Sequence, residues 1–546
     1  MLTGRRARIH HLTRNRRFLI RTSVAILCAG LFLGCAIHWL RSASGESGGA
    51  SLPGDPRLAE LSETRRQLAA STDPQPRKVM HWLRKLISMS DQIPELMEQE
   101  EMDLSSFQEN GILHTFQARD LITQHTKAGA ERDGFIDFIT VHLAADEPPG
   151  IAAMERIRQR AAVEPPPPYA NELLAHIRLA QGASADALVA FIREGASPGA
   201  ETARDSALRL AIELRDRETL EELKLTTDWI TAAPPWLQSR IGAMTGDVWL
   251  QWRGILGHQI SHTRWALLLL ALFSATLWYV IFAQRSPKDR WRWARPMIPL
   301  IAGVCSVWPT LMILAYQEYH LGMSADSPFP HDLWYYIAGV GLREELSKLA
   351  LFAFFLPWLL WRRDAGLALL TGAFVGLGFA LEENIQYYNS GGGVAWTRFV
   401  TANFMHTSMT AICGHALYEM VRTRFGHAEK FVITFVTIVL AHGCYDYAIV
   451  AKHEMAQFMG IGIFSLIILA MLANQFFDLL HDLTRAGTGM ISPASVFMIG
   501  SALLIAIMFI RAGLTSIDLA DIAAVGSECV SIAPVAFIFL RKFELR

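Results

Sequence analysis

Acidic, imidazole and lysine side chains interrupt four apolar stretches in the second half of this 546-residue chain. A charged side chain at bilayer depth costs roughly 2.5–3.5 kcal/mol on insertion scales, so such residues usually mark function. A carboxylate in a low-dielectric cavity can take a proton from water, and imidazoles can stabilise a developing oxyanion. The candidates for this chemistry are Glu344, Glu345, Glu383, His406 and His442, supported by Lys348, Asn384 and Asp446.

Helical spacing places several of these residues on shared faces. Glu344 and Lys348 are separated by four positions, as are His442 and Asp446, so each pair lies on one face of its helix. We therefore interpret Lys348 as the counter-charge of Glu344 or Glu345.

Two neighbouring acids compete for one role in the second stretch. Glu383 follows Phe379 at the i, i+4 interval and precedes an asparagine. Glu382 points roughly 100° away around the same helix. The pattern therefore favours Glu383 as the functional acid.

The elements that must position these residues are membrane helices. The chain is 51% hydrophobic and 18% charged, which is typical of a protein with a membrane part and a soluble part. Long apolar runs predict an all-α bundle of about ten spans. The predicted spans are 22–40, 264–284, 296–317, 333–361, 365–388, 397–421, 431–451, 457–479, 492–511 and 520–541.

Residues 41–260 have a different composition. They contain 32 Asp and Glu against 23 Lys and Arg, and no apolar run of span length. Amphipathic segments separated by Gly and Pro predict short paired helices, as in an α-solenoid. We expect a helical domain inserted between the first span, 22–40, and the membrane domain, 264–541.

The basic residues indicate the topology. Residues 1–21 contain seven arginines and no acid, and basic joins alternate with non-basic ones after successive spans. The positive-inside rule then predicts that both termini are cytoplasmic and that residues 41–260 are extracytoplasmic.

This topology gives the candidate residues similar depths. At about 1.5 Å per residue, Glu344, Glu383, His406, His442 and Asp446 fall roughly 8–17 Å below the outer surface. Three small residues, Gly372, Gly376 and Gly378, would let their span approach its neighbours closely. We therefore expect one shared site in the outer half of the membrane.

Two other classes of protein receive no support. A net charge of −1 gives no indication of nucleic-acid binding. The six cysteines all lie in apolar segments without CxxC spacing, so we expect no disulfide framework and no zinc ribbon.

Four motifs occur in order on consecutive predicted spans. They are EELSK at 344–348, FALEEN at 379–384, HTSMTAICG at 406–414 and HGCYDY at 442–447. In this order they resemble the PrsW family of intramembrane proteases, which is similar to type II CAAX prenyl endopeptidases and bacteriocin-processing membrane proteases. The resemblance covers a core at about 300–451 and does not extend to residues 41–260.

The resemblance implies peptide-bond hydrolysis in or near the lipid bilayer of a bacterial cell (inner) membrane. Its implied substrate is a membrane-anchored regulator such as an anti-sigma factor. Two mechanisms remain open: a glutamate-and-histidine mechanism without metal, and a metalloprotease in which Glu345, His406 and His442 bind zinc. Residues 41–260 would offer a surface for a protein partner.

Membrane proteins of other functional classes also contain buried ionisable groups. A proton- or ion-coupled transporter usually shows two corresponding halves, and this sequence shows no internal repeat. A catalytically inactive receptor or scaffold would need no complete set of motifs, whereas all four are present.

Overall fold

The structure is a computed structural model of the chain. It describes residues 4–43, 64–65, 67–68, 70–71, 73–88, 118–143, 147–287, 290–390, 395–450, 461–484, 491–515 and 519–544. Parts of the predicted region 41–260, chiefly 44–63 and 89–117, lie outside these residues, as does the start of the predicted span 457–479.

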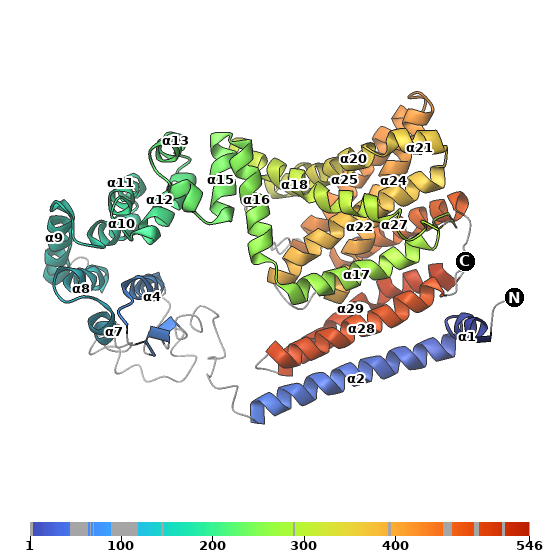
Figure 1. Cartoon of the computed structure of the whole chain (residues 1–546), viewed down its shortest axis with the longest axis horizontal. Helices are drawn as coiled ribbons and strands as arrows, with labels where there is room; N and C mark the ends of the chain where they lie inside the picture. Colours follow the sequence, from blue (N-terminus) through green and yellow to red (C-terminus); the bar gives the residue numbers. More distant parts are fainter. Residues whose placement is uncertain are drawn as a thin grey trace. The chain divides into compact units, whose positions relative to one another are not determined.

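Every regular element in the described part of the chain is a helix, and the chain divides into two compact units (Figure 1). The membrane unit comprises 1–47 and 251–546, and the second unit comprises 48–250. The six cysteines are all free.

The membrane unit contains long apolar helices and several shorter ones. They are α1 (Gly4–Leu12), α2 (Arg16–Ala43), α16 (Val248–His262), which begins at the boundary, α17 (Trp265–Ala283), α18 (Met297–His320), α19 (His331–Trp334), η1 (Tyr335–Gly341), α20 (Leu342–Ala353), α21 (Leu356–Arg362), α22 (Ala365–Ser390), α23 (Ala395–Val400), α24 (Ala402–Arg422), α25 (Ala428–Val450), α27 (Ile461–Leu483), α28 (Pro493–Thr515) and α29 (Leu519–Glu544).

Eight of the described helices are long and apolar enough to cross a membrane. Two of the ten predicted spans are not among them. The predicted span 333–361 is divided into α19, η1, α20 and α21, and the predicted span 397–421 consists of α23 and α24. In the first stretch none of the four helices is long enough to span a membrane. In the second, α24 is long enough but contains polar residues such as Asn403 and His406, which lower its mean hydropathy.

Helix α22 is the centre of the membrane unit, with 94% of its most apolar window buried. It packs against α24 and α18 at glycine contacts. A Cβ atom on Gly376 would lie 2.1 Å from the carbonyl oxygen of His406, and one on Gly378 would lie 1.9 Å from that of Leu300. Glycine is required here because the backbones touch, as the sequence predicted for Gly376 and Gly378.

A π-helix, η1, leads directly into α20. Such π-helical turns are rare and often occur at functional sites. The turn packs against α25, where a Cβ on Gly443 would lie 2.5 Å from the Cα of Ile337. This contact holds the residue after His442 against the start of α20.

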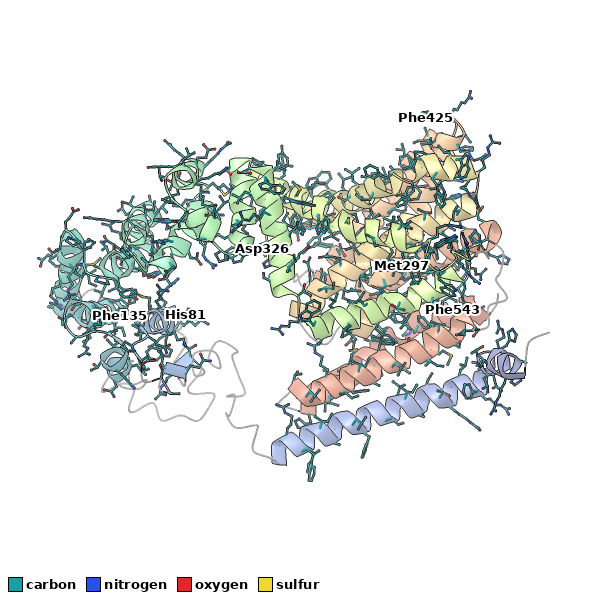
Figure 2. All side chains as sticks on the ribbon, viewed as in Figure 1. His81, Phe135, Met297, Asp326, Phe425 and Phe543 are labelled. Atoms are coloured by element: carbon teal, nitrogen blue, oxygen red, sulfur yellow. The ribbon has the colours of Figure 1, made fainter. Side chains whose placement is uncertain are left out.

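The second unit is a series of short helices that pack mainly on their neighbours in the chain. They are α4 (Pro76–Ser88), α7 (Ala118–His125), α8 (Ala130–Leu143), α9 (Pro148–Ala162), α10 (Ala170–Ala180), α11 (Ser184–Gly195), α12 (Glu201–Glu213), α13 (Arg217–Thr226), α14 (Trp229–Ala232) and α15 (Pro235–Thr245). Its core includes Trp82, Phe135 and Phe138, and Figure 2 labels Phe135 within it.

Candidate active site

The predicted site residues come from four helices that contact one another: α20, α22, α24 and α25. Most of these residues are buried: taken as whole residues, Lys348 is 0% exposed, His406 and His442 are 1%, Glu345 is 2% and Glu344 is 7%. The structure therefore brings together residues separated by about a hundred positions in the sequence, in one polar cluster inside an apolar bundle.

His442 on α25 is held by acids of α20. Its Nδ1 donates to Glu345 Oε1 at 2.8 Å, and its Nε2 lies 3.5 Å from Glu344 Oε2. Asp446, one turn further along α25, places Oδ2 3.3 Å from the same Nε2. The predicted i, i+4 relation between His442 and Asp446 is thus a contact in the structure.

His406 on α24 is held between an acid and a cation. Its Nε2 donates to Glu383 Oε2 at 2.9 Å, while Lys348 Nζ donates to its Nδ1 at 2.8 Å. The His406 and His442 rings lie 5.2 Å apart between centroids. Each imidazole therefore has one nitrogen fixed by a carboxylate, Glu383 or Glu345, and a second nitrogen that faces the centre of the cluster.

Lys348 links the two acids of α20 to His406. Its ammonium lies 2.8 Å from Glu345 Oε1 and 3.4 Å from Glu344 Oε2, and 4.0 Å from the ring centroid of Phe379. A buried ammonium of this kind needs both carboxylates because the desolvation of an unpaired charge is costly. Lys348 therefore pairs with both acids of α20 in the structure.

The two adjacent acids of α22 face in different directions. Glu383 faces the cluster, whereas Glu382 accepts hydrogen bonds from Gln259 at 2.6 Å and from Gln386 at 3.0 Å. Glu382 is thus bound on another side of the helix.

One group of residues in the described part of the chain has the geometry to hold a metal ion. Three ligand atoms, one each from Glu344, His406 and His442, all lie within 4.8 Å of one another. The sequence analysis placed Glu345 in this set. In the structure Glu345 instead accepts from His442 Nδ1, behind the imidazole, and Glu344 takes its place.

Arg398 is a site residue that sequence reasoning missed. Its Nη2 lies 2.5 Å from Glu383 Oε2, and its Nε donates to Asn384 Oδ1 at 2.6 Å. Asn384 in turn donates to Asn403 at 2.6 Å. The available signal was an arginine at the beginning of a predicted span, on the side where basic residues are otherwise scarce.

The comparison with protein families bears on this part of the chain. Residues 290–474 match the family described as PrsW family intramembrane metalloprotease. Residues 290–474 form a PrsW-family domain. No curated protein and no solved structure matched the chain.

The PrsW domain contains all four helices that supply the cluster, and its family identifies it as a peptidase domain. The match begins before α18 and ends within α27, so it excludes the second unit and the helices α28 and α29. The peptidase match and the polar cluster therefore lie in the same part of the membrane unit.

Proposed function

We propose that the PrsW domain hydrolyses a peptide bond of a membrane-anchored regulatory protein, of the anti-sigma-factor type, at the cluster of Glu344, His406 and His442. The observation that carries this proposal is the burial of two imidazoles and a carboxylate, all within reach of one reacting centre, among helices of an intramembrane peptidase family. The membrane is that of a bacterial cell, with both termini in the cytoplasm and residues 41–260 outside.

The residues present fit a zinc ion. Two imidazoles and one carboxylate are a usual protein ligand set of catalytic zinc. Each imidazole also donates its other nitrogen to a carboxylate, as ligating histidines commonly do. Four carboxylates, those of Glu344, Glu345, Glu383 and Asp446, surround the cluster, and Lys348 and Arg398 are the cations beside them. If all are ionised, two negative charges remain, which favours a divalent cation.

Zinc, when bound, polarises the scissile carbonyl and lowers the pKa of a bound water. The residues of the chain orient this centre. Glu383 fixes the His406 tautomer by accepting from Nε2, and Glu345 fixes that of His442 by accepting from Nδ1. The Lys348 ammonium would have to give up its contacts with His406 Nδ1 and Glu344 Oε2.

Glu344 would have a different task in the mechanism without metal. Its side chain is 9% exposed against 1% for Glu345, so it is the acid of this pair that a substrate can approach. Without a metal, Glu344 would take the proton of the attacking water and His442 would stabilise the oxyanion. The two mechanisms therefore assign the same residues to different tasks.

The test compares three proteins reconstituted in nanodiscs: wild type, Glu344→Gln and Glu382→Gln. A quenched fluorescent peptide carrying a membrane anchor reports cleavage. We expect a loss of at least about 10²-fold for Glu344→Gln and little change for Glu382→Gln. Wild-type cleavage by Glu344→Gln would contradict the proposal.

Metal analysis of the same samples separates the two mechanisms. We expect zinc bound to wild type and lost from His406→Ala and His442→Ala. Full cleavage after exhaustive chelation would exclude the zinc assignment and leave hydrolysis by Glu344 standing. Comparative membrane proteomics of cells carrying wild type or Glu344→Gln would then identify the accumulating substrate.

A further inference from the structure

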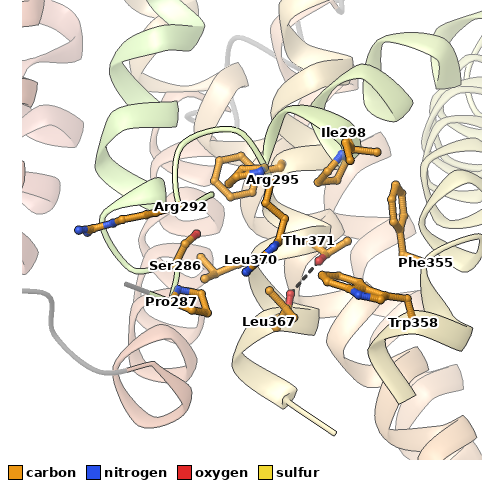
Figure 3. A pocket seen from close by; sticks show the side chains of 13 residues that line it. Ser286, Pro287, Arg292, Arg295, Ile298, Phe355, Trp358, Leu367, Leu370 and Thr371 are labelled. Carbon is orange, nitrogen blue, oxygen red and sulfur yellow. Dashed lines mark hydrogen bonds between the residues drawn. The ribbon is translucent and has the colours of Figure 1, made fainter. Parts of the chain in front are cut away.

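A cavity in the membrane unit lies apart from the candidate active site. Its volume is about 260 Å³, and its lining residues come from 286–287 and 292–299, from the beginning of helix α21 and from the first half of α22 (Figure 3). Phe374 is the lining residue of α22 that comes nearest in sequence to Glu383 of the polar cluster. Nine residues of helix separate the two by roughly 14 Å. None of the cluster residues lines this cavity, so it is not part of the peptidase site.

The walls of this cavity are apolar. They are formed by proline rings and by aliphatic and aromatic side chains such as Phe355, Trp358, Leu370 and Phe374. Water gains few hydrogen bonds in such a space, whereas a hydrocarbon chain fills it favourably. The cavity therefore suits an apolar chain.

An arginine gives the cavity a charged end. Figure 3 shows the Arg295 side chain extending over Leu370 and Thr371, while Arg292 points away from them. Arg292 caps the end of α17, where its Nε donates to the carbonyl oxygen of Ala283 at 3.0 Å. Arg295 lines the cavity and extends toward α22, where its guanidinium can meet the polar end of a molecule whose chain lies in the cavity.

The surroundings are those of a membrane boundary. The cavity is lined where α17 has ended and α18 and α22 begin, so several helix ends meet at one face of the bundle. Trp291 and Trp293 beside it are 53% and 48% exposed, and exposed tryptophans are enriched at the level of lipid headgroups. Basic pockets between membrane helices at such a boundary bind anionic headgroups.

We propose that this cavity binds an anionic phospholipid of the adjoining leaflet, with an acyl chain among Trp358, Leu370 and Phe374 and the phosphate at Arg295. The guanidinium of Arg295, which lines the cavity in a segment (290–295) that contains no acid, selects an anionic lipid over a zwitterionic one. The lipid would contact α21 and α22, the second of which carries Glu383.

The test uses full-length protein in detergent and counts retained lipid by native mass spectrometry. Phosphatidylglycerol and phosphatidylcholine with identical chains are offered in turn. We expect wild type to retain phosphatidylglycerol preferentially and Arg295→Gln to bind it about fivefold more weakly. Arg290→Gln, which removes a neighbouring arginine that does not line the cavity, should bind as wild type does.

A photoreactive phosphatidylglycerol with its reactive group on the acyl chain locates the site. We expect crosslinks in the peptides that contain Phe355, Trp358 and Leu370, and their loss in Leu370→Trp, which fills the space and keeps the charge. Glycerol phosphate alone, without a chain, should not compete. The proposal would be overturned if wild type retained both lipids equally, or if the crosslinks were the same in wild type, Arg295→Gln and Leu370→Trp.

Discussion

Glu383 is fixed from two sides, by the imidazole of His406 and by the guanidinium of Arg398. A carboxylate that must hold an imidazole in one tautomer works only if its own orientation is fixed, and Arg398 provides that constraint. The same arginine lies 3.8 Å above the ring of Tyr387 and bonds Asn384, so its planar group is held on three sides. Arg398 is accordingly a positioning residue that acts through Glu383.

Replacing Arg398 should therefore lower activity without removing a reacting group. We expect Arg398→Gln to reduce kcat about 10- to 100-fold, the usual effect of removing a group behind a ligand. Arg398→Lys should recover little because a lysine cannot reproduce the two directed contacts. The measurement is peptide cleavage in nanodiscs together with zinc content.

Arg422 is the matched control for Arg398. It is the last residue of α24, whereas Arg398 lies on α23 just before that helix. The Arg422 side chain is 50% exposed and pairs with Glu419 at 2.6 Å. Exposed pairs of this kind contribute about 0–1 kcal/mol, so Arg422→Gln should cleave normally. Equal losses in both variants would indicate a general weakening of the adjoining helices α23 and α24 and contradict the assigned role of Arg398.

At the scale of the elements, the site depends on backbones that touch. Helix α22 approaches α24 at Gly376, directly beside His406, and α25 approaches η1 at Gly443, directly after His442. In both places the glycine neighbours a site imidazole in space or in sequence. The two histidines reach one centre because their helices can pack this closely.

Gly376→Ala tests this dependence. The added Cβ would lie 2.1 Å from the His406 carbonyl oxygen, so α24 must shift. We expect a stability loss of about 1–3 kcal/mol from overpacking, and a fall in cleavage larger than this loss of folded protein explains. Thermal unfolding and cleavage of the same sample provide the comparison.

Gly526→Ala in α29 is the control, since a Cβ at that glycine meets nothing within 4 Å. It should leave cleavage unchanged, and it should stabilise the helix slightly because alanine is the better helix former. A normally active Gly376→Ala protein would show that the close contact does not position His406.

The sequence predicted the membrane helices well where their apolar composition alone determines where they lie. Long apolar runs identified eight of the ten predicted spans as long apolar helices. Helical i, i+4 spacing favoured Glu383 over Glu382 and paired His442 with Asp446. It could not reveal η1, because a π-helical turn leaves no periodic pattern in seven residues. It also could not distinguish Glu344 from Glu345, since adjacent acids differ only in which one the bundle turns toward His406.

Arg398 shows a different limit. Its partner Glu383 lies on another helix, and no pattern in a single sequence links positions 383 and 398 across a turn. Contacts between helices depend on how the helices rotate and cross, and packing decides this rather than local propensity.

At the scale of the whole molecule, the second unit has its own buried charges. Burial and the neighbouring Glu194 raise the pKa of Glu172 from 4.5 to about 7. Burial also lowers the pKa of His176 from 6.5 to about 3. The two groups have opposite effects on how the free energy of unfolding changes with pH. The folded unit keeps the Glu172 proton at a pH where the unfolded chain has lost it, whereas His176 releases its proton on folding at a pH where the unfolded chain would keep it.

Glu172 should make this unit less stable as the pH rises. Between pH 4.5 and 7 the folded state binds more protons at this group than the unfolded state, so stability falls with pH. As the pH rises across this window, we expect the free energy of unfolding of Glu172→Gln to increase relative to that of wild type by about 3 kcal/mol. Urea unfolding of residues 48–250 at pH 5 and pH 8 measures it, and His176 cancels because both proteins contain it.

Glu201→Gln is the control for that measurement. Its carboxylate is 60% exposed and its pKa is lowered, so any effect lies below pH 4.5. A constant difference between Glu172→Gln and wild type from pH 5 to pH 8 would show that Glu172 does not titrate in this window.

The division of the chain into two units suggests a division of labour. The PrsW match lies entirely in the membrane unit, and the clustered Glu344, His406 and His442 lie there too. The second unit consists of short packed helices, the kind of surface that binds peptides or partner domains. We propose that this unit controls which substrate reaches the site and performs no chemistry.

Deleting residues 48–247 and joining the ends with a flexible linker tests this proposal. Hydrolysis of a generic membrane-anchored peptide should persist, because the four site helices remain, whereas cleavage of the natural substrate should be lost or become unregulated. Full-length Glu344→Gln is the contrasting protein, since it keeps the second unit and should lose both activities. Size-exclusion chromatography and thermal unfolding establish that the shortened protein is folded. If it is folded and fails to cleave even the generic peptide, the second unit takes part in forming the active enzyme, and selection of substrates cannot be its only task.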